Sequence, residues 1–327
     1  TKLNTLSFKS IEGFLKIDLV DKDNKRSHSY QDTNSLPDMV GLSLAEQHFI
    51  QGGIAQNLRS DGRGREDFRS FSIESGVIPQ ANGSARVRIG STDVIATVKA
   101  DLGKPSLYKP DQGKVEICVE CSSTAAPEFE RRGGDELSME LSGALQRSLL
   151  GGTSGAGAGI DLSNLKVVEG KFCWDLYIEG LVLSSDGNLL DALAIAIKAA
   201  LSNTCIPKVE VVPGTSPDQQ DDVGISDEEF SHLDTSRVPI IVTLTKVGMA
   251  YIVDATLEEE SQMRSAVSVS FNKLGHVCGL TKRGGAGLDP SIVLAMISVA
   301  KHVGQRLTTL VDSEIAAAEA RIADDQL

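Results

Sequence analysis

LVLSSDGNLLDALAIAIKAALSNTCIPK, residues 181–208, decides the fold. Three apolar residues end a strand, and the Ser-Asp-Gly-Asn turn after them breaks the strand and supplies a helix cap. The helix expected over 189–201 is apolar on nearly every side, and its only charged residues are Asp191 and Lys198. Such a helix is typically buried, so we expect it at the centre of the protein. The residues expected to end it are Asn203 and Pro207.

Asp186 lies at the corner between this strand and this helix. A carboxylate at the edge of a buried strand–helix unit is a common position for a catalytic acid or a metal ligand. Asp before Gly is more often ordinary turn chemistry. The local pattern favours the turn and leaves the functional interpretation open.

The composition excludes several classes of protein. A length of 327 residues suffices for about two domains, and an aromatic content of 4% means that aliphatic side chains must fill the core. A formal net charge of −13 argues against binding nucleic acid with the whole surface, so any such contact needs a local basic segment. Five scattered cysteines, an odd number, fit free thiols in a reducing compartment. The sequence has no 18-residue apolar run that predicts a membrane span.

The first 64 residues are expected to precede the main domains. Residues 1–38 mix acidic and basic side chains, unlike a targeting peptide, and we interpret them as a poorly ordered extension or an over-long gene model. Residues 39–64 contain an expected amphipathic helix, which ends at about Gln51, and the start of a basic segment.

This basic strip, LRSDGRGREDFR (58–69), is punctuated by glycine. Its arginines are suited to follow phosphates, and Arg63 and Arg65 are the candidates for such contact. The alternative is a solvated loop in which the arginines pair with carboxylates of the strip itself. Those carboxylates are Asp61, Glu66 and Asp67.

Alternating apolar residues predict a first α+β unit over 65–207. Strands are expected at 72–78, 85–89, 94–98, 114–122 and 174–183. Asp135 is expected to cap a helix whose apolar residues recur at helical spacing. This core stripe consists of Leu137, Leu141, Ala144, Leu145 and Leu149.

Arg131 and Arg132 come just before this helix, in a glycine-flanked loop. The alternative to a binding role is a loop ion pair with Glu128 and Glu130. Exposed pairs of that kind contribute about 0 to 1 kcal/mol. Stability therefore gives little reason for two arginines there, and we favour a binding role.

Motifs for cofactors or metals are incomplete. GGTSGAGAG (151–159) follows a helix instead of a strand and lacks the Gly-Lys-Ser/Thr of a phosphate-binding loop, so we interpret it as a flexible loop. Cys118 and Cys121 have the spacing of half a zinc site, but on an expected strand they face opposite sides. We expect no metal and no cofactor. The histidines, which stand alone without ligand spacing, are His28, His48, His232, His276 and His302.

The second half begins after an acidic segment. Residues 208–236 are rich in Pro, Gly and acidic side chains and are expected to form a linker or a long surface loop. Residues 237–312 are expected to form a second α+β unit with strands at 240–247, 251–255, 267–271 and 276–280. A long helix is expected to begin at Asp289-Pro290, with 313–327 as its end or tail. Its inward residues are expected to be Ile292, Met296, Val299, Val303, Leu307 and Leu310.

Several segments together resemble a known family. They are LRSDGRGR (58–65), RRGGDELSME (131–140), SDGNLLDA (185–192), Ile-Pro (206–207) and VDATLEE (253–259). In this order, over about residues 39–310, they resemble the RNase PH-like subunits of the RNA exosome ring, in a non-catalytic, ribosomal-RNA-processing branch. The resemblance implies an α+β RNase PH-like fold. This fold has two β-α units, a ribosomal protein S5 domain 2-like core and a smaller C-terminal α+β domain.

The resemblance also implies partners. Such subunits form heterodimers in a six-membered ring that carries cap subunits and is threaded by single-stranded RNA. We therefore expect ring subunits of the same fold, cap subunits and RNA as partners, and neither DNA nor a membrane. The expected location is the nucleus and nucleolus, and also the cytoplasm. The candidates for contact with the RNA backbone are Arg131, Arg132, Arg63 and Arg65.

Catalytic members of this family are phosphorolytic exoribonucleases, which hold phosphate with arginines and supply an acidic residue. The resemblance places that acid at Asp186. It places Leu137 where a phosphate-binding arginine opens the helix, and Leu181 where active members have a further carboxylate. An anionic transition state without its arginines loses the electrostatic term that usually carries most of such catalysis. We therefore expect no catalytic residue, with Asp186 as a vestige.

Three functions remain open. The first is a non-catalytic ring subunit that supports 3′-to-5′ RNA processing and degradation, and this is the one we favour. The second is an active phosphate-dependent exoribonuclease, which calls for an arginine at position 137. The third is a small-molecule enzyme on a similar fold, which requires a polar constellation near Asp186 that the sequence does not reveal.

Overall fold

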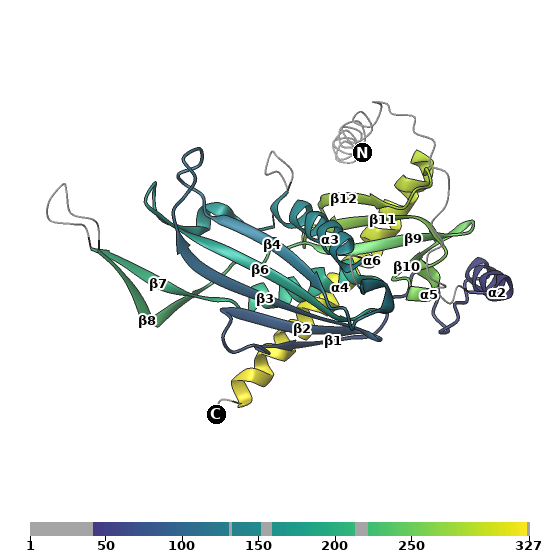
Figure 1. The fold of residues 1–327 in the computed structure, drawn as a ribbon, viewed down its shortest axis with the longest axis horizontal. Coiled ribbons are helices and arrows are strands. Elements are labelled where there is room, and N and C mark those ends of the chain that lie inside the picture. Colours follow the sequence, from purple (N-terminus) through teal and green to yellow (C-terminus); the bar gives the residue numbers. More distant parts are fainter. Residues whose placement is uncertain (1–41, 131–132, 152–158, 213–221, 326–327) are drawn as a thin grey trace. The chain divides into compact units, whose positions relative to one another are not determined.

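The computed structural model describes residues 42–130, 133–151, 159–212 and 222–325. Expectations for residues 1–38, for Arg131 and Arg132, and for most of the glycine-rich loop lie outside these residues. Residues from Leu42 onward form one compact unit. Its elements are drawn in Figure 1.

The first half of the unit is built on a mixed sheet. Its strands are β1 (Phe71–Ser75), β2 (Gly83–Ile89), β3 (Thr92–Gly103), β4 (Lys114–Cys121), β5 (Lys166–Val168) and β6 (Phe172–Ser184). The order is β1-β2-β3-β6-β4, with β5 paired to β6. Only β4 and β6 run parallel, because α3 and the segments around it connect them; the other pairs are antiparallel. The five strands expected in this region are confirmed.

The central helix, α4 (Leu189–Ser202), confirms the burial that its sequence predicts. Every residue from Leu189 to Leu201 is buried, including Asp191 and Lys198. The helix packs against β2 and β3 on one side and against β9 of the second sheet on the other. It therefore joins the two halves, and its apolar side chains belong to one core that extends over both sheets.

The expected ends of α4 need one correction. Asn203 caps the C-terminus as expected, but Pro207 lies within β7, beyond the helix. At the N-terminus the cap residue is Asn188, whose backbone is left-handed and whose side chain makes no capping bond. The Asn188 side chain bonds Asp254 instead, so tertiary pairing replaces the local cap.

Helix α3 (Gly133–Leu150) also starts earlier than expected. Asp135 lies inside its first turn and is not the cap, because the helical backbone already begins at Gly133. The core stripe is confirmed, with Leu137 partly buried at its start. The fully buried members are Leu141, Ala144, Leu145 and Leu149.

The second sheet has the order β10-β9-β11-β12. Its strands are β9 (Ile240–Val247), β10 (Ala250–Val253), β11 (Met263–Phe271) and β12 (Val277–Arg283), all paired antiparallel. Both hairpins expected from the sequence are present. The short helix α5 (Leu257–Glu260) lies between β10 and β11.

The C-terminal helix α6 (Pro290–Asp325) begins as expected, with the Asp289 carboxylate accepting the Ser291 N–H at 2.8 Å. It packs against β1, β9 and β11. Leu310 was expected to point inward, but its residue is 54% exposed and Val311 is buried instead. The reason is helical geometry, since the buried positions follow a spacing of four after Leu307.

The acidic segment is partly a β-ribbon and not only a linker. Strand β7 (Cys205–Val212) pairs antiparallel with β8 (Asp222–His232) in a separate two-stranded sheet, at the left of Figure 1. Cross-strand side-chain pairs contribute to the stability of such a ribbon. One such pair joins Lys208 Nζ to Glu229 Oε2 at 2.7 Å.

The N-terminal helix α2 (Leu44–Ala55) is present as expected and ends four residues beyond Gln51. Ser43 and Glu46 form a reciprocal capping box at its start. Ile50 and Ile54 pack in a small cluster with residues of β9 and β10. Two 3₁₀ turns complete the elements: η1 (Pro127–Phe129) and η2 (Leu162–Leu165).

Gly83 is a close contact between β2 and the end of α4. A Cβ atom there would collide with the Thr204 side chain and with the Ala200 carbonyl oxygen. We expect Gly83→Ala to destabilise the protein by at least about 1–3 kcal/mol, as overpacking does. Urea unfolding measures the loss.

The matched control is Gly52→Ala in α2, where an added Cβ meets nothing within 4 Å. This change is expected to stabilise the helix by about 0.5–1 kcal/mol, because Ala has the higher helix propensity. Equal effects of the two substitutions would contradict the predicted contact at Gly83.

Candidate functional site

The backbone of the Asp186 corner is held by the Thr92 hydroxyl of the neighbouring strand β3. The Asp186 N–H donates to Thr92 Oγ1 at 3.0 Å, and the Thr92 hydroxyl donates to the Gly187 carbonyl at 2.9 Å. Gly187 has φ +78° and lies against the backbone of residues 255–257, so a side chain would not fit there. The turn interpretation of Asp186 thus accounts for its backbone, while its side chain remains 35% exposed.

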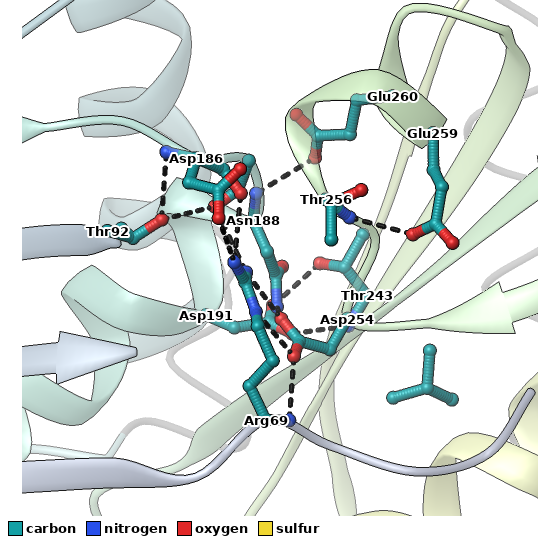
Figure 2. Close-up of polar contacts among 12 residues, drawn as sticks. Arg69, Thr92, Asp186, Asn188, Asp191, Thr243, Asp254, Thr256, Glu259 and Glu260 are labelled. Atoms are coloured by element: carbon teal, nitrogen blue, oxygen red, sulfur yellow. Dashed lines mark hydrogen bonds and ion pairs between the residues drawn. The ribbon is translucent and has the colours of Figure 1, made fainter. Parts of the chain in front are cut away.

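Arg69 links this corner to the second half of the chain, as Figure 2 shows. Its Nη1 lies 3.2 Å from Asp186 Oδ2 and also donates to the Asp186 carbonyl at 2.9 Å. Its Nε and Nη2 each donate to Asp254 at 2.9 Å, one to each carboxylate oxygen. The guanidinium therefore binds Asp254 bidentately through Nε and Nη2, and its third nitrogen, Nη1, binds Asp186.

Asp254 is the centre of the network. Its side chain is fully buried, and its backbone has φ +49°, a conformation rare for residues other than glycine. Besides Arg69, its carboxylate accepts bonds from Arg63 Nη1 at 2.9 Å and from Asn188 Nδ2 at 2.7 Å. Burial acts to raise the pKa of Asp254, but the bonds and charge of Arg69 outweigh it and hold that pKa below its usual value.

A second buried ion pair lies beside it. Arg59 and Glu259 both have side chains at most 1% exposed, and Arg59 Nε donates to Glu259 Oε1 at 2.9 Å. Arg59 also donates to the carbonyl oxygens of Val253 and Asp254. The basic strip is thus fastened to the segment that follows β10.

Two further carboxylates lie around the N-terminus of α4. Asp191 is fully buried and accepts bonds from the Thr243 N–H and hydroxyl at 2.9 and 2.6 Å. Burial raises the pKa of Asp191 to about 7, against those bonds. Glu260 accepts the Asn188 N–H at 3.1 Å, and burial raises its pKa despite the nearby Arg283.

The predicted site residues are brought together only in part. Arg63 has a side chain 14% exposed and bonds Asp61 at 2.6 Å as well as Asp254, so it lies in the network with little free surface. Arg65 Nε donates to Asn57 Oδ1 at 3.3 Å, away from the carboxylates. The expected pairing of the strip with its own acids therefore holds for Asp61, while the RNA role of Arg63 and Arg65 stays a prediction.

The residues missed by the sequence analysis are Arg69, Asp254 and Glu259 as a connected group. The polar constellation near Asp186, which the sequence did not reveal, is therefore present. Its members are committed to one another and mostly buried, so it is not an open small-molecule site. The available signal was VDATLEE (253–259), which contains three acidic residues and no basic one.

The described residues contain no group of three or more His, Cys, Asp or Glu side chains placed to hold a metal ion. Among the same residues, no helix is long and apolar enough to cross a membrane.

Comparison with known proteins identifies the family. Residues 67–207 match domain 1 of the 3′ exoribonuclease family, RNase PH, and residues 237–303 match domain 2. The chain belongs to this family, and its fold is the RNase PH-like fold expected from the sequence.

Within the family, its relatives are exosome proteins of the Rrp42 type. A protein of Dictyostelium discoideum named for the exosome complex exonuclease RRP42 is 36% identical over 321 residues, which cover 85% of this chain and 98% of that protein. The exosome complex component Rrp42 of Methanopyrus kandleri is 36% identical over 245 residues, or 75% and 87% of the two chains. The solved structure of the Archaeoglobus fulgidus exosome with RNA bound to the active site contains a chain 30% identical, with a TM-score of 0.66. The match covers 80% of this chain and 96% of that one.

We predict that Arg69→Met destabilises the protein by about 3–5 kcal/mol, because it removes the main partner of a buried carboxylate. Asp254→Asn is also expected to be destabilising, and the double substitution to cost clearly less than the sum of the two. Urea unfolding of the four proteins gives the coupling.

The control is Arg88→Met. Arg88 pairs with Glu74, and the two side chains are 43% and 47% exposed; its other partner, Asp93, lies 3.5 Å away and keeps its shorter pair with Arg86. We expect a change of about 0–1 kcal/mol for such a surface pair. Additive effects of the Arg69 and Asp254 substitutions would refute their direct pairing.

The raised pKa of Asp191 predicts a pH dependence of stability. A carboxyl that binds its proton more tightly when folded stabilises the protein fully below about pH 4, and that contribution is lost as pH rises to about 7. Asp191→Asn lacks this loss, so the variant should gain stability relative to wild type between about pH 5 and about pH 8. The gain is on the order of a few kcal/mol, because a difference of one in pKa corresponds to about 1.4 kcal/mol.

Chemical denaturation at several pH values measures that difference. Asp101→Asn, at an exposed position of β3, is the control and should show no trend. A constant difference between Asp191→Asn and wild type would rule out the raised pKa.

Proposed function

We propose that this chain is a non-catalytic subunit of an exosome core ring, which supports 3′-to-5′ RNA processing and degradation. The family and the Rrp42-type relatives support its place in such a ring. The Archaeoglobus structure is an exosome with RNA bound, and it supports RNA as the molecule that is threaded through the proposed ring. Its partners are then RNase PH-like ring subunits, cap subunits and single-stranded RNA, in the nucleus, nucleolus and cytoplasm.

One observation carries the non-catalytic part of this proposal. Arg69, the arginine bonded to Asp186, has two of its three nitrogens on the buried Asp254. Freeing it to bind phosphate would leave Asp254 short of its main partner in a dry environment, at a cost of several kcal/mol. Phosphoryl transfer needs unengaged positive charge around the anionic transition state. Among the described residues, the arginine bonded to Asp186 is engaged by Asp254 and does not supply it.

The two family positions that differ give further support. Leu137 is partly buried against the core at the start of α3, and Leu181 is half-buried on β6. Neither side chain binds phosphate or carries a charge. Asp186 retains a partly exposed carboxylate, and this favours residual phosphorolytic activity as the second candidate.

An exoribonuclease assay distinguishes the two candidates. The purified chain, with labelled single-stranded RNA, phosphate and magnesium, is expected to release no nucleoside diphosphates. Release in proportion to the protein concentration, abolished by Asp186→Ala, would overturn the non-catalytic assignment. Arg88→Ala, a change at an exposed ion pair, serves as the control.

Assembly is tested separately. Co-expression with RNase PH-like exosome subunits, followed by light scattering, is expected to give a ring-sized complex that contains this chain. A thermally stable monomer that stays apart from those subunits would contradict the ring proposal, whatever the assay of activity shows.

A further inference from the structure

A cavity of about 380 Å³ lies away from the Asp186 network, beside the C-terminal helix. One wall is the turn between β11 and β12, and the other is one face of α6. The two walls come close to each other at Gly275, where an added Cβ would lie 3.4 Å from the Gln305 amide nitrogen and 3.6 Å from Lys301 Cε. The side chains that matter for binding are Asn272, Lys273, Lys301, Gln305 and Asp312.

The unused hydrogen-bonding capacity of this cavity consists mainly of donors. Within the described part of the chain, Lys301 and Gln305 have no side-chain hydrogen bond or ion pair. Asn272 Oδ1 already accepts the His276 N–H at 2.9 Å, which leaves its amide N–H groups free. The Thr308 hydroxyl donates its hydrogen bond to the Gly304 carbonyl at 2.7 Å, so it is not available as a donor to a ligand. Free N–H groups from two opposing walls suit an anion.

The charges point the same way. Asp312 is the one acidic residue among the cavity's lining residues, and it is shared by two lysines: Lys198 Nζ lies 2.7 Å from Oδ1 and Lys273 Nζ 3.2 Å from Oδ2. Although burial opposes it, hydrogen bonds from Lys198 and Lys273 keep the pKa of Asp312 below its usual value, so it is ionised. Two lysines, Lys273 and Lys301, line the cavity together with this one carboxylate, which Lys198 also neutralises, in a chain whose net charge is −13.

Lys273 is able to turn to a ligand at low cost. The Lys198 side chain is 6% exposed and remains on Asp312, so the carboxylate keeps a partner when Lys273 leaves. Lys273 itself is 63% exposed and has room to move. The Lys198–Asp312 pair thus stays in place, while the two more exposed lysines, Lys273 and Lys301, are available to a ligand.

We propose that this cavity binds a small phosphorylated ligand of about the size of a nucleoside monophosphate. The phosphate is held by Lys301, Lys273 and Gln305. We choose phosphate over a carboxylate because donors on opposing walls match a tetrahedral oxyanion better than a planar one. The volume exceeds that of phosphate alone and leaves room for the rest of a small ligand. This site is independent of the Asp186 corner and of the proposed ring function.

Calorimetry of the full chain with AMP, inorganic phosphate and adenosine tests the proposal. We expect one AMP site per chain, and weaker binding by about tenfold or more for Lys301→Gln, which loses a charge-assisted bond. Adenosine lacks the phosphate, so it should bind the wild-type chain at least about tenfold more weakly than AMP does. Lys301 is exposed, so the variant is expected to fold, and circular dichroism checks this. The matched control is Lys99→Gln, at an exposed lysine of β3, which should leave AMP binding unchanged.

Each further outcome decides the matter. Phosphate binding as tight as AMP binding, with the same loss in Lys301→Gln, supports the anion site and identifies free phosphate as sufficient. No binding of AMP or phosphate, or binding unaffected by Lys301→Gln, overturns the proposal. Lys301-dependent binding of a single-stranded RNA without binding of AMP or phosphate also overturns it, because the site would then serve a polynucleotide backbone.

Discussion

The buried carboxylate of Asp254 is the constraint on which the arrangement of the two halves depends. Removing a carboxylate from water costs several kcal/mol unless charged donors surround it. Here Arg63, Arg69 and Asn188 supply those donors, and they come from the basic strip and from the start of α4. The position of β10 relative to the first sheet is therefore specified by charge pairing as well as by the shared apolar core.

This arrangement also explains what the conspicuous charged motifs do. The sequence of the basic strip by itself resembles a phosphate-binding segment. In the structure, however, Arg59 and Arg69 pair with carboxylates from the second half of the chain, Glu259 and Asp254. Asp186 lies at the rim of the same network and keeps part of its surface. Much of the charge around this corner thus maintains the junction between domains, which leaves less of it for binding an anionic substrate.

The features predicted correctly from the sequence are those that depend on neighbours in the chain. The apolar content of α4, the hairpins and the Asp289-Pro290 start of α6 all follow from residues a few positions apart. The errors have the opposite cause. Asn188 gives up its local cap for Asp254, 66 residues away, and Arg69 finds that same carboxylate 185 residues away, a distance that no spacing rule covers. The network was invisible for this reason, although both of its halves were noticed as motifs.

The separation of the two halves of the network has a consequence for synthesis. Arg59 and Glu259 are 200 residues apart, and a ribosome adds about 5–20 residues per second, so the strip waits about 10–40 s for its partners. During that interval the nascent chain carries the guanidinium groups of Arg59 and Arg69 without the carboxylates that later bury them. The first sheet and α4 are complete in sequence before Asp254 is made. The charges of the chain's N-terminal side are then neutralised only when its C-terminal half is made, before α6 (Pro290–Asp325) completes the core against β1 and β9.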